Sequence, residues 1–104
     1  MTPVDVWFWY CRALAAREAG AVAGLGRGLA YTPRGWELSD VVTPIVRHAR
    51  RGRLTDAHLR VLRRYGAEQR EPVADHAQEA GDAALWGEAL DLLSVDWRRK
   101  GMLP

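Results

Sequence analysis

Apolar residues recur at intervals of three and four along most of the chain, and this spacing predicts α-helices. Near the N-terminus, Thr2 and Pro3 are suited to begin a helix, and Gly20 is suited to end it. The apolar positions of this helix lie on one face: Val4, Trp7, Phe8, Cys11, Leu14 and Ala15. We expect this face to pack into the core.

Two aromatic residues, Trp9 and Tyr10, fall off this apolar face and are expected to point outward. An exposed tryptophan often marks an interface, because its side chain supplies a large contact area at a low entropy cost. Trp9 and Tyr10 are therefore candidate contacts for a protein partner or a second copy of the chain. The alternative is that another element of the same chain covers Trp9. Cys11 is expected to be a small buried hydrophobe rather than a nucleophile, since no histidine lies near it in sequence.

The segment 20–37 contains five glycines and interrupts the helical pattern. We expect a Gly-rich loop with a turn from Thr32 to Gly35, and Trp36 anchoring the loop to the core. Its GLGRG sequence matches neither common phosphate-binding glycine pattern, and no strand is expected before it. A connecting role is therefore favoured over phosphate binding.

A second helix is expected to begin near Ser39 or Asp40 and to end at Gly52. Pro44 allows another interpretation, in which Thr43 is the cap and Pro44 takes the first helical position. The apolar stripe of this helix comprises Leu38, Val41, Val42, Ile45 and Ala49.

A third helix is expected between its cap, Thr55, and Gly66. After a linker around Pro72, residues 73–101 predict either one helix with a weak point at Gly81 or a short helix followed by a long one over 82–100. The inner face of the last helix should carry Trp86, Leu90, Leu93 and Trp97. These elements predict a small single all-α domain over residues 1–104, a bundle of four to five helices with a central helix-turn-helix-like pair and a Gly-rich loop.

Basic residues concentrate in the middle of the chain, where residues 47–64 hold seven arginines and one carboxylate, Asp56. Two basic helices joined by a turn with Gly52 have the outline of a helix-turn-helix, whose second helix can lie in the DNA major groove. The nucleic-acid-binding residues predicted on this basis are Arg50, Arg51, Arg53, Arg60, Arg63 and Arg64. His48 and His58 depart from the packing residues of that family, and both are expected at the edge of the helix pair.

Acidic residues dominate the following segment, where residues 65–96 hold eight carboxylates and one arginine. This segment can pair with the basic middle within the fold or face a different partner. Its tightest titratable cluster comprises Asp75, His76, Glu79 and Asp82. We interpret it as a solvated acidic face rather than a metal site, because a metal would require a second His or Cys nearby.

The net charge is +2, and 48% of the residues are hydrophobic, which is ordinary for a globular protein. A single cysteine and the lack of a signal-peptide or membrane-length apolar run predict a cytoplasmic protein without a membrane partner. No catalytic or cofactor-binding motif is present, so we expect neither enzymatic activity nor a cofactor. In composition alone the chain resembles accessory proteins of phages and mobile elements.

Two functions are consistent with these patterns. The first is a small regulatory nucleic-acid-binding protein, for example in transcription regulation, that uses the Arg-rich segment on DNA or RNA. The alternative is a protein-binding adaptor or inhibitor that acts through the aromatic residues of the first helix or through the acidic last helix.

Overall fold

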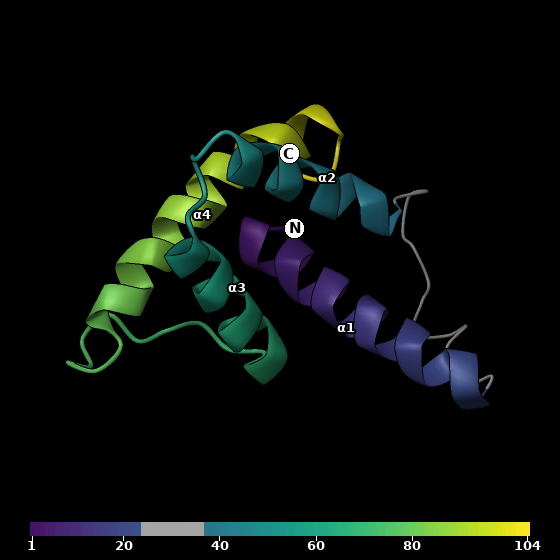
Figure 1. Ribbon diagram of the computed structural model, residues 1–104, viewed down its shortest axis with the longest axis horizontal. Helices are drawn as coiled ribbons and strands as arrows, with labels where there is room; N and C mark the ends of the chain where they lie inside the picture. The colour runs from purple at the N-terminus through teal and green to yellow at the C-terminus, as the bar shows by residue number, and fades with distance from the viewer. Residues whose placement is uncertain (24–36) are drawn as a thin grey trace.

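Four helices make up the regular structure of the computed structural model, which describes residues 1–23 and 37–104, the last four residues of α1 by their backbone alone. They are α1 (Pro3–Ala23), α2 (Leu38–Arg50), α3 (Asp56–Glu68) and α4 (Ala80–Arg99) (Figure 1). The all-α expectation is confirmed for these residues. Within the same residues, no helix is long and apolar enough to cross a membrane. The turn expected at Thr32 and the anchor expected at Trp36 lie outside the described part of the chain.

Helix α1 begins as predicted and extends further than predicted. The backbone N–H of Thr2 donates to the Asp5 carboxylate at 2.9 Å, and the N–H of Asp5 donates to Thr2 Oγ1 at 3.2 Å. This reciprocal pair satisfies two amides that a helix start leaves free. The helix passes through Gly20 to Ala23, so the expected end at Gly20 is wrong.

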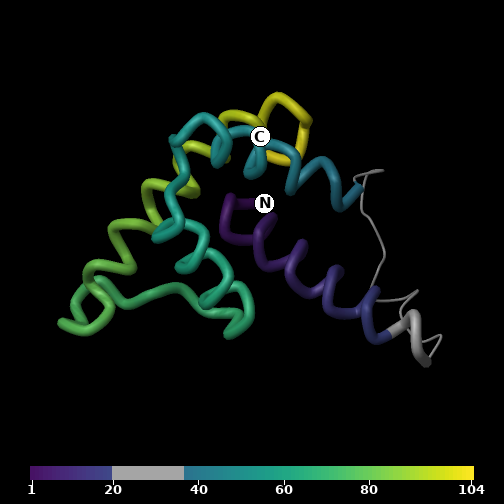
Figure 2. Tube along the Cα trace, in the orientation of Figure 1, coloured from purple at the N-terminus to yellow at the C-terminus, as the bar shows by residue number. Residues whose placement is uncertain are grey.

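The other three helices all pack against α1, which lies between α2 and α3 in Figures 1 and 2. Because neighbours surround it, α1 is buried on more than one side. Besides Trp7, its buried side chains are Val6, Trp9, Ala13 and Ala16. Trp9 is only 7% exposed, so the expectation that it faces outward is wrong. Tyr10 is half-buried and stacks on Trp7 with ring centroids 5.3 Å apart.

Helix α2 begins one to two residues before the expected start. Glu37 precedes it, and the Glu37 N–H donates to the Asp40 carboxylate at 3.0 Å. Pro44 therefore lies inside the helix, where it is buried, and the alternative start at Thr43 is wrong. A proline here removes the bond to the carbonyl four residues earlier, but its ring adds apolar surface to the packed face.

The end of α2 at Gly52 is confirmed. Gly52 has φ +75°, a conformation that glycine adopts without strain. Its N–H donates to the Ala49 carbonyl at 3.1 Å, and the Arg53 N–H donates to the His48 carbonyl at 2.9 Å. These two bonds form a Schellman motif, which satisfies carbonyls at the helix end.

Helix α3 begins at its expected cap, because the His58 N–H donates to Thr55 Oγ1 at 3.4 Å. It does not stop at Gly66 but continues to Glu68, after which Gln69 adopts φ 55°. Helices α2 and α3 do not pack on each other, since each packs on α1 and α4 instead. The central helix-turn-helix-like pair is therefore not confirmed.

Helix α4 begins at Ala80, so Gly81 lies in its first turn. All four residues predicted for its inner face, Trp86, Leu90, Leu93 and Trp97, are buried. Two buried indoles join helices through backbone carbonyls. Trp97 Nε1 donates to the Val41 carbonyl at 3.2 Å, and Trp7 Nε1 donates to the Leu62 carbonyl at 2.9 Å. The first bond fixes the end of α4 against α2, and the second fixes α1 against α3.

Candidate nucleic-acid interface

The six arginines predicted to bind nucleic acid fall into two separate groups. Arg50, Arg51 and Arg53 lie at the end of α2 and in the turn after it, whereas Arg60, Arg63 and Arg64 lie on α3. Because α2 and α3 do not pack on each other, the two groups of arginines do not form the single surface that a helix-turn-helix would give them. The two groups also differ in their partners.

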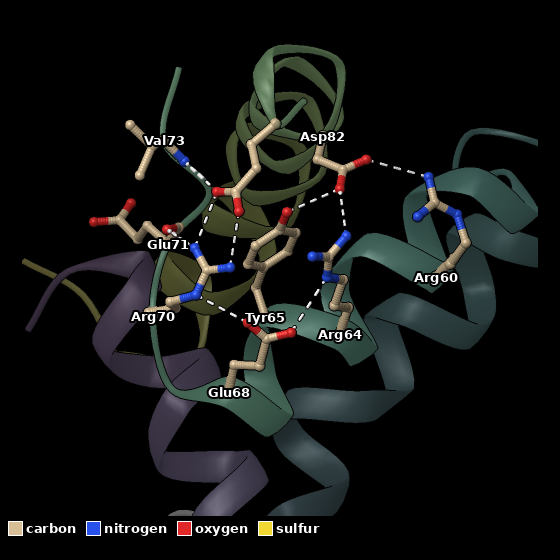
Figure 3. A network of polar contacts seen from close by, with 9 residues as sticks. Arg60, Arg64, Tyr65, Glu68, Arg70, Glu71, Val73 and Asp82 are labelled. Carbon is tan, nitrogen blue, oxygen red and sulfur yellow. Dashed lines mark hydrogen bonds and ion pairs between the residues drawn. The ribbon is translucent and has the colours of Figure 1, made fainter. Parts of the chain in front are cut away.

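Two of the three α3 arginines, Arg60 and Arg64, are held by carboxylates of the same chain (Figure 3). Arg60 and Arg64 contact the two oxygens of Asp82 at 3.2 and 3.4 Å, and the Tyr65 hydroxyl donates to Asp82 at 2.8 Å. The Tyr65 bond, followed by Arg60, lowers the pKa of Asp82, whose side chain is only 12% exposed. This carboxylate is therefore charged at neutral pH and offsets part of the α3 charge. Arg63 donates to the Leu59 carbonyl in its own helix at 3.4 Å.

The same network continues into the connection between α3 and α4. Arg70 donates to both oxygens of Glu79 at 2.9 and 2.8 Å and to Glu68 at 2.9 Å. The guanidinium groups of Arg64 and Arg70 lie 5.0 and 5.1 Å from the ring centroid of Tyr65. The bond from Arg70 is the main cause that lowers the pKa of Glu79 to about 2.

The acidic segment thus pairs with the basic middle within the fold, as one of the two interpretations predicted. Glu79 and Asp82 are engaged with arginines, so the solvated acidic face is only partly present. In the described part of the chain, no group of three or more His, Cys, Asp or Glu side chains is placed to hold a metal ion.

Both histidines of the basic segment are buried, so their expected place at the edge of a helix pair is wrong. His48 is 5% exposed, and its Nε2 lies 2.7 Å from Asp96, which also pairs with Arg47. His58 Nδ1 accepts from the Thr55 N–H at 3.0 Å, so Nε2 carries the ring proton of the neutral form and donates to Glu88 at 2.9 Å. Each histidine therefore links its own helix to α4.

The second group of arginines belongs to a surface that we call the basic patch. It surrounds two adjoining hollows, one of about 610 Å³ between the ends of α2 and α4 and one of about 420 Å³ along the outer side of α2. Arg47 and Arg51 line both hollows. Among the lining residues the single carboxylate is Asp96, which is already paired with Arg47 and His48. The cations of the basic patch are Arg47, Arg50, Arg51, Arg53, Arg99 and Lys100.

Sequence reasoning placed three of these cations in the predicted site and missed Arg47, Arg99 and Lys100. Arg99 and Lys100 lie at the basic end of α4, where positive charges also complement the helix dipole. The signal that could have found them is that both α2 and α4 end in basic residues. Whether two helix ends meet is decided by packing, here by the contacts of Asp96 in α4 with Arg47 and His48 in α2.

No family model, curated protein or solved structure matches this chain. The class of protein therefore rests on the geometry described above, a small helical protein whose cations gather at the ends of α2 and α4. Two of these cations have partners within the chain, since Arg47 pairs with Asp96 and Lys100 lies 4.0 Å from Asp40.

Proposed function

We propose that this protein is a small regulatory nucleic-acid-binding protein that contacts the phosphate backbone through the basic patch. The observation that carries the proposal is the arrangement of six cations around two adjoining hollows lined by a single, already paired carboxylate. Guanidinium groups match phosphate oxygens with two parallel hydrogen bonds, and neutralising phosphates releases counterions from nucleic acid.

The basic patch is a better candidate surface for nucleic-acid binding than α3 is as a recognition helix. Arg60 and Arg64 already share Asp82, and a phosphate would have to compete with that carboxylate. Arg51 and Arg53 are exposed and form no ion pair within the described residues. Contacts to phosphates position a protein without identifying bases, so we expect weak sequence preference.

The salt dependence of binding tests this proposal. For the parent protein on labelled duplex DNA and RNA, log affinity should fall with log salt by about 0.9 per phosphate contacted. The double variant Arg51→Ala/Arg53→Ala should reduce that slope by about one to two, which fluorescence anisotropy at several salt concentrations measures. Its melting temperature should remain close to that of the parent, because exposed charges contribute little to folding.

The matched control is Arg60→Ala/Arg64→Ala, which removes the same charge from α3. It should leave the salt slope close to the parent value, because these arginines are engaged with Asp82. The proposal is wrong if the parent does not bind at about 50 mM salt, where phosphate contacts are strong. It is also wrong if the α3 variant flattens the slope as much as the variant of the basic patch.

A further inference from the structure

A third hollow of about 760 Å³, which we call the α1 groove, lies over α1 with α2 and α3 as its walls. It exists because α2 and α3 pack on α1 without packing on each other. The groove is lined mainly by apolar side chains, including Tyr10, Cys11, Leu14, Val42, Leu59 and Leu62. It is therefore a different kind of surface from the basic patch.

The floor of the α1 groove is the apolar face that the sequence predicts for the core. At 100° per residue, Cys11 points roughly opposite to Trp9 and Ala13, which the other helices bury. Cys11 and Leu14 are only half-buried. Helix α1 thus carries two apolar sides, and the second remains accessible along the groove. Burial raises the pKa of the Cys11 thiol to about 11, which indicates an apolar environment.

The charges at the edge of the α1 groove indicate what kind of partner fits. Arg12 and Arg63 line it from α1 and α3, and Glu18 is the single carboxylate that does so. Arg12 donates to the Gln69 side chain at 2.8 Å, and Arg63 donates to the Leu59 carbonyl. Within the described part of the chain, neither arginine forms an ion pair. Both can therefore pair with carboxylates of a bound molecule.

The length of the α1 groove matches a short helix. From Trp7 to Glu18 its floor extends about 17 Å at 1.5 Å per residue, which equals about three helical turns. A bound helix would cover the open side of α1 as α2, α3 and α4 cover its other sides. Such an occupant would present one apolar residue per turn, at positions i, i+3 or i+4, and i+7.

We infer that the α1 groove binds an amphipathic helix of a partner protein, with three apolar anchors facing α1 and acidic residues beside Arg12 and Arg63. This activity is separate from nucleic-acid binding, because Arg12 and Arg63 do not line the hollows of the basic patch.

The test is a selection with the intact protein from a displayed library of random 16-residue peptides. The enriched peptides should share the anchor spacing and carry acidic residues on the flanks. Leu14→Glu should weaken their binding by about tenfold or more, because it places a charge among the anchors. Arg63 is exposed, so Arg63→Glu should leave the fold intact. This variant should bind the acidic peptides more weakly than the parent does, but it should not weaken the binding of peptides in which lysine replaces the acidic residues. Val73→Glu, at an exposed apolar residue outside the groove, is the matched control and should bind normally.

Three results would overturn the inference. The first is a selection without enrichment, or one whose peptides bind both groove variants as well as the parent. The second is a parent that is a dimer by native mass and becomes a monomer in Arg63→Glu, which would assign the groove to a second copy. The third is peptide binding that appears only after residues 24–36 are replaced by a Gly-Ser linker, which would assign it to the chain itself. Nucleic-acid binding by Arg63→Glu is measured in parallel. Failure of the proposed peptide binding is then distinguishable from failure of the proposed nucleic-acid binding.

Discussion

Gly66 lies at the contact between α1 and α3, where the structure leaves no space for a side chain. A Cβ atom at this position would lie 2.5 Å from Cys11 Sγ and 2.8 Å from Trp7 Nε1. The Trp7 indole cannot easily move away, because it donates to the Leu62 carbonyl one turn earlier in α3. Glycine is therefore required here for the close approach of two helices and not for ending one.

We predict that Gly66→Ala destabilises the protein by about 1 to 3 kcal/mol through overpacking, although alanine favours helices by about 1 kcal/mol over glycine. The free energy of unfolding in denaturant measures the change. Gly87→Ala in α4 is the matched control, because its Cβ would meet no atom within 4 Å. That variant should be as stable as the parent or more stable. Equal stabilisation by both substitutions would show that the contact at Gly66 is not tight.

Residues whose role is local could be predicted from the sequence, and residues whose role is tertiary could not. Thr2, Thr55 and Gly52 cap helices through bonds to residues no more than four positions away, and their roles were predicted correctly. Gly66 was interpreted as a helix end because sequence alone does not show that Cys11 lies beside it. The prediction for Trp9 was wrong for a related reason. Three helices pack around α1, so residues outside its single predicted apolar stripe are buried as well.

At the scale of elements, the connection from α3 to α4 is organised by one carboxylate. Glu79, just before α4, accepts two bonds from Arg70 and one from the Val73 N–H at 2.9 Å. The chain between these residues contains no helix, so these bonds hold it against the end of α3. Glu79 thereby adds to the two backbone turn bonds of this connection, in which the His76 N–H donates to the Val73 carbonyl and the Glu79 N–H donates to the His76 carbonyl.

The depressed pKa of Glu79 makes this connection sensitive to acid. Because its folded pKa of about 2 lies below the ordinary value of 4.5, Glu79 stabilises the fold fully above about pH 4.5 and loses that effect as pH falls toward 2. We predict that Glu79→Gln lowers the melting temperature at neutral pH and weakens the loss of stability between those pH values. Asp75→Asn, an exposed carboxylate in the same connection, is the control. A parallel pH profile for Glu79→Gln and the parent would contradict this account.

The four helices were predictable as elements, whereas their arrangement was not. The inner face of α4 was correct in all four residues because its apolar spacing persists over several turns. The helix-turn-helix-like pair was inferred from adjacency in sequence. In the structure, α2 and α3 each pack on α1 and α4, and adjacency in sequence does not predict these contacts. The basic patch follows from the same packing.

At the scale of the whole molecule, ion pairs within the chain determine which charges remain for partners. Carboxylates at and near α4 bind the cations of α2 and α3, as in the pairs of Asp96 with Arg47 and of Asp82 with Arg60. Cations without such partners in the described residues remain at the basic patch and at the edge of the α1 groove. Net charge alone, +2, would not have indicated either surface.

Substitutions at the neighbouring residues Trp9 and Tyr10 distinguish the core of α1 from the floor of its groove. Because Trp9 is almost fully buried, Trp9→Ala should destabilise the protein by about 3 to 5 kcal/mol. Tyr10→Ala should cost less, since Tyr10 is half-buried and its ring stacks on Trp7 at the edge of the α1 groove. Thermal unfolding measures both changes.

Binding by the same two variants completes the comparison. Trp9→Ala should reduce phosphate binding and peptide binding together, in proportion to the loss of folded protein. Tyr10→Ala should weaken the selected peptides while retaining the parent's salt slope on nucleic acid, because Tyr10 lines the α1 groove and not the basic patch. If Trp9→Ala melts like the parent and loses only peptide binding, Trp9 is a surface contact and the packing described for α1 is wrong.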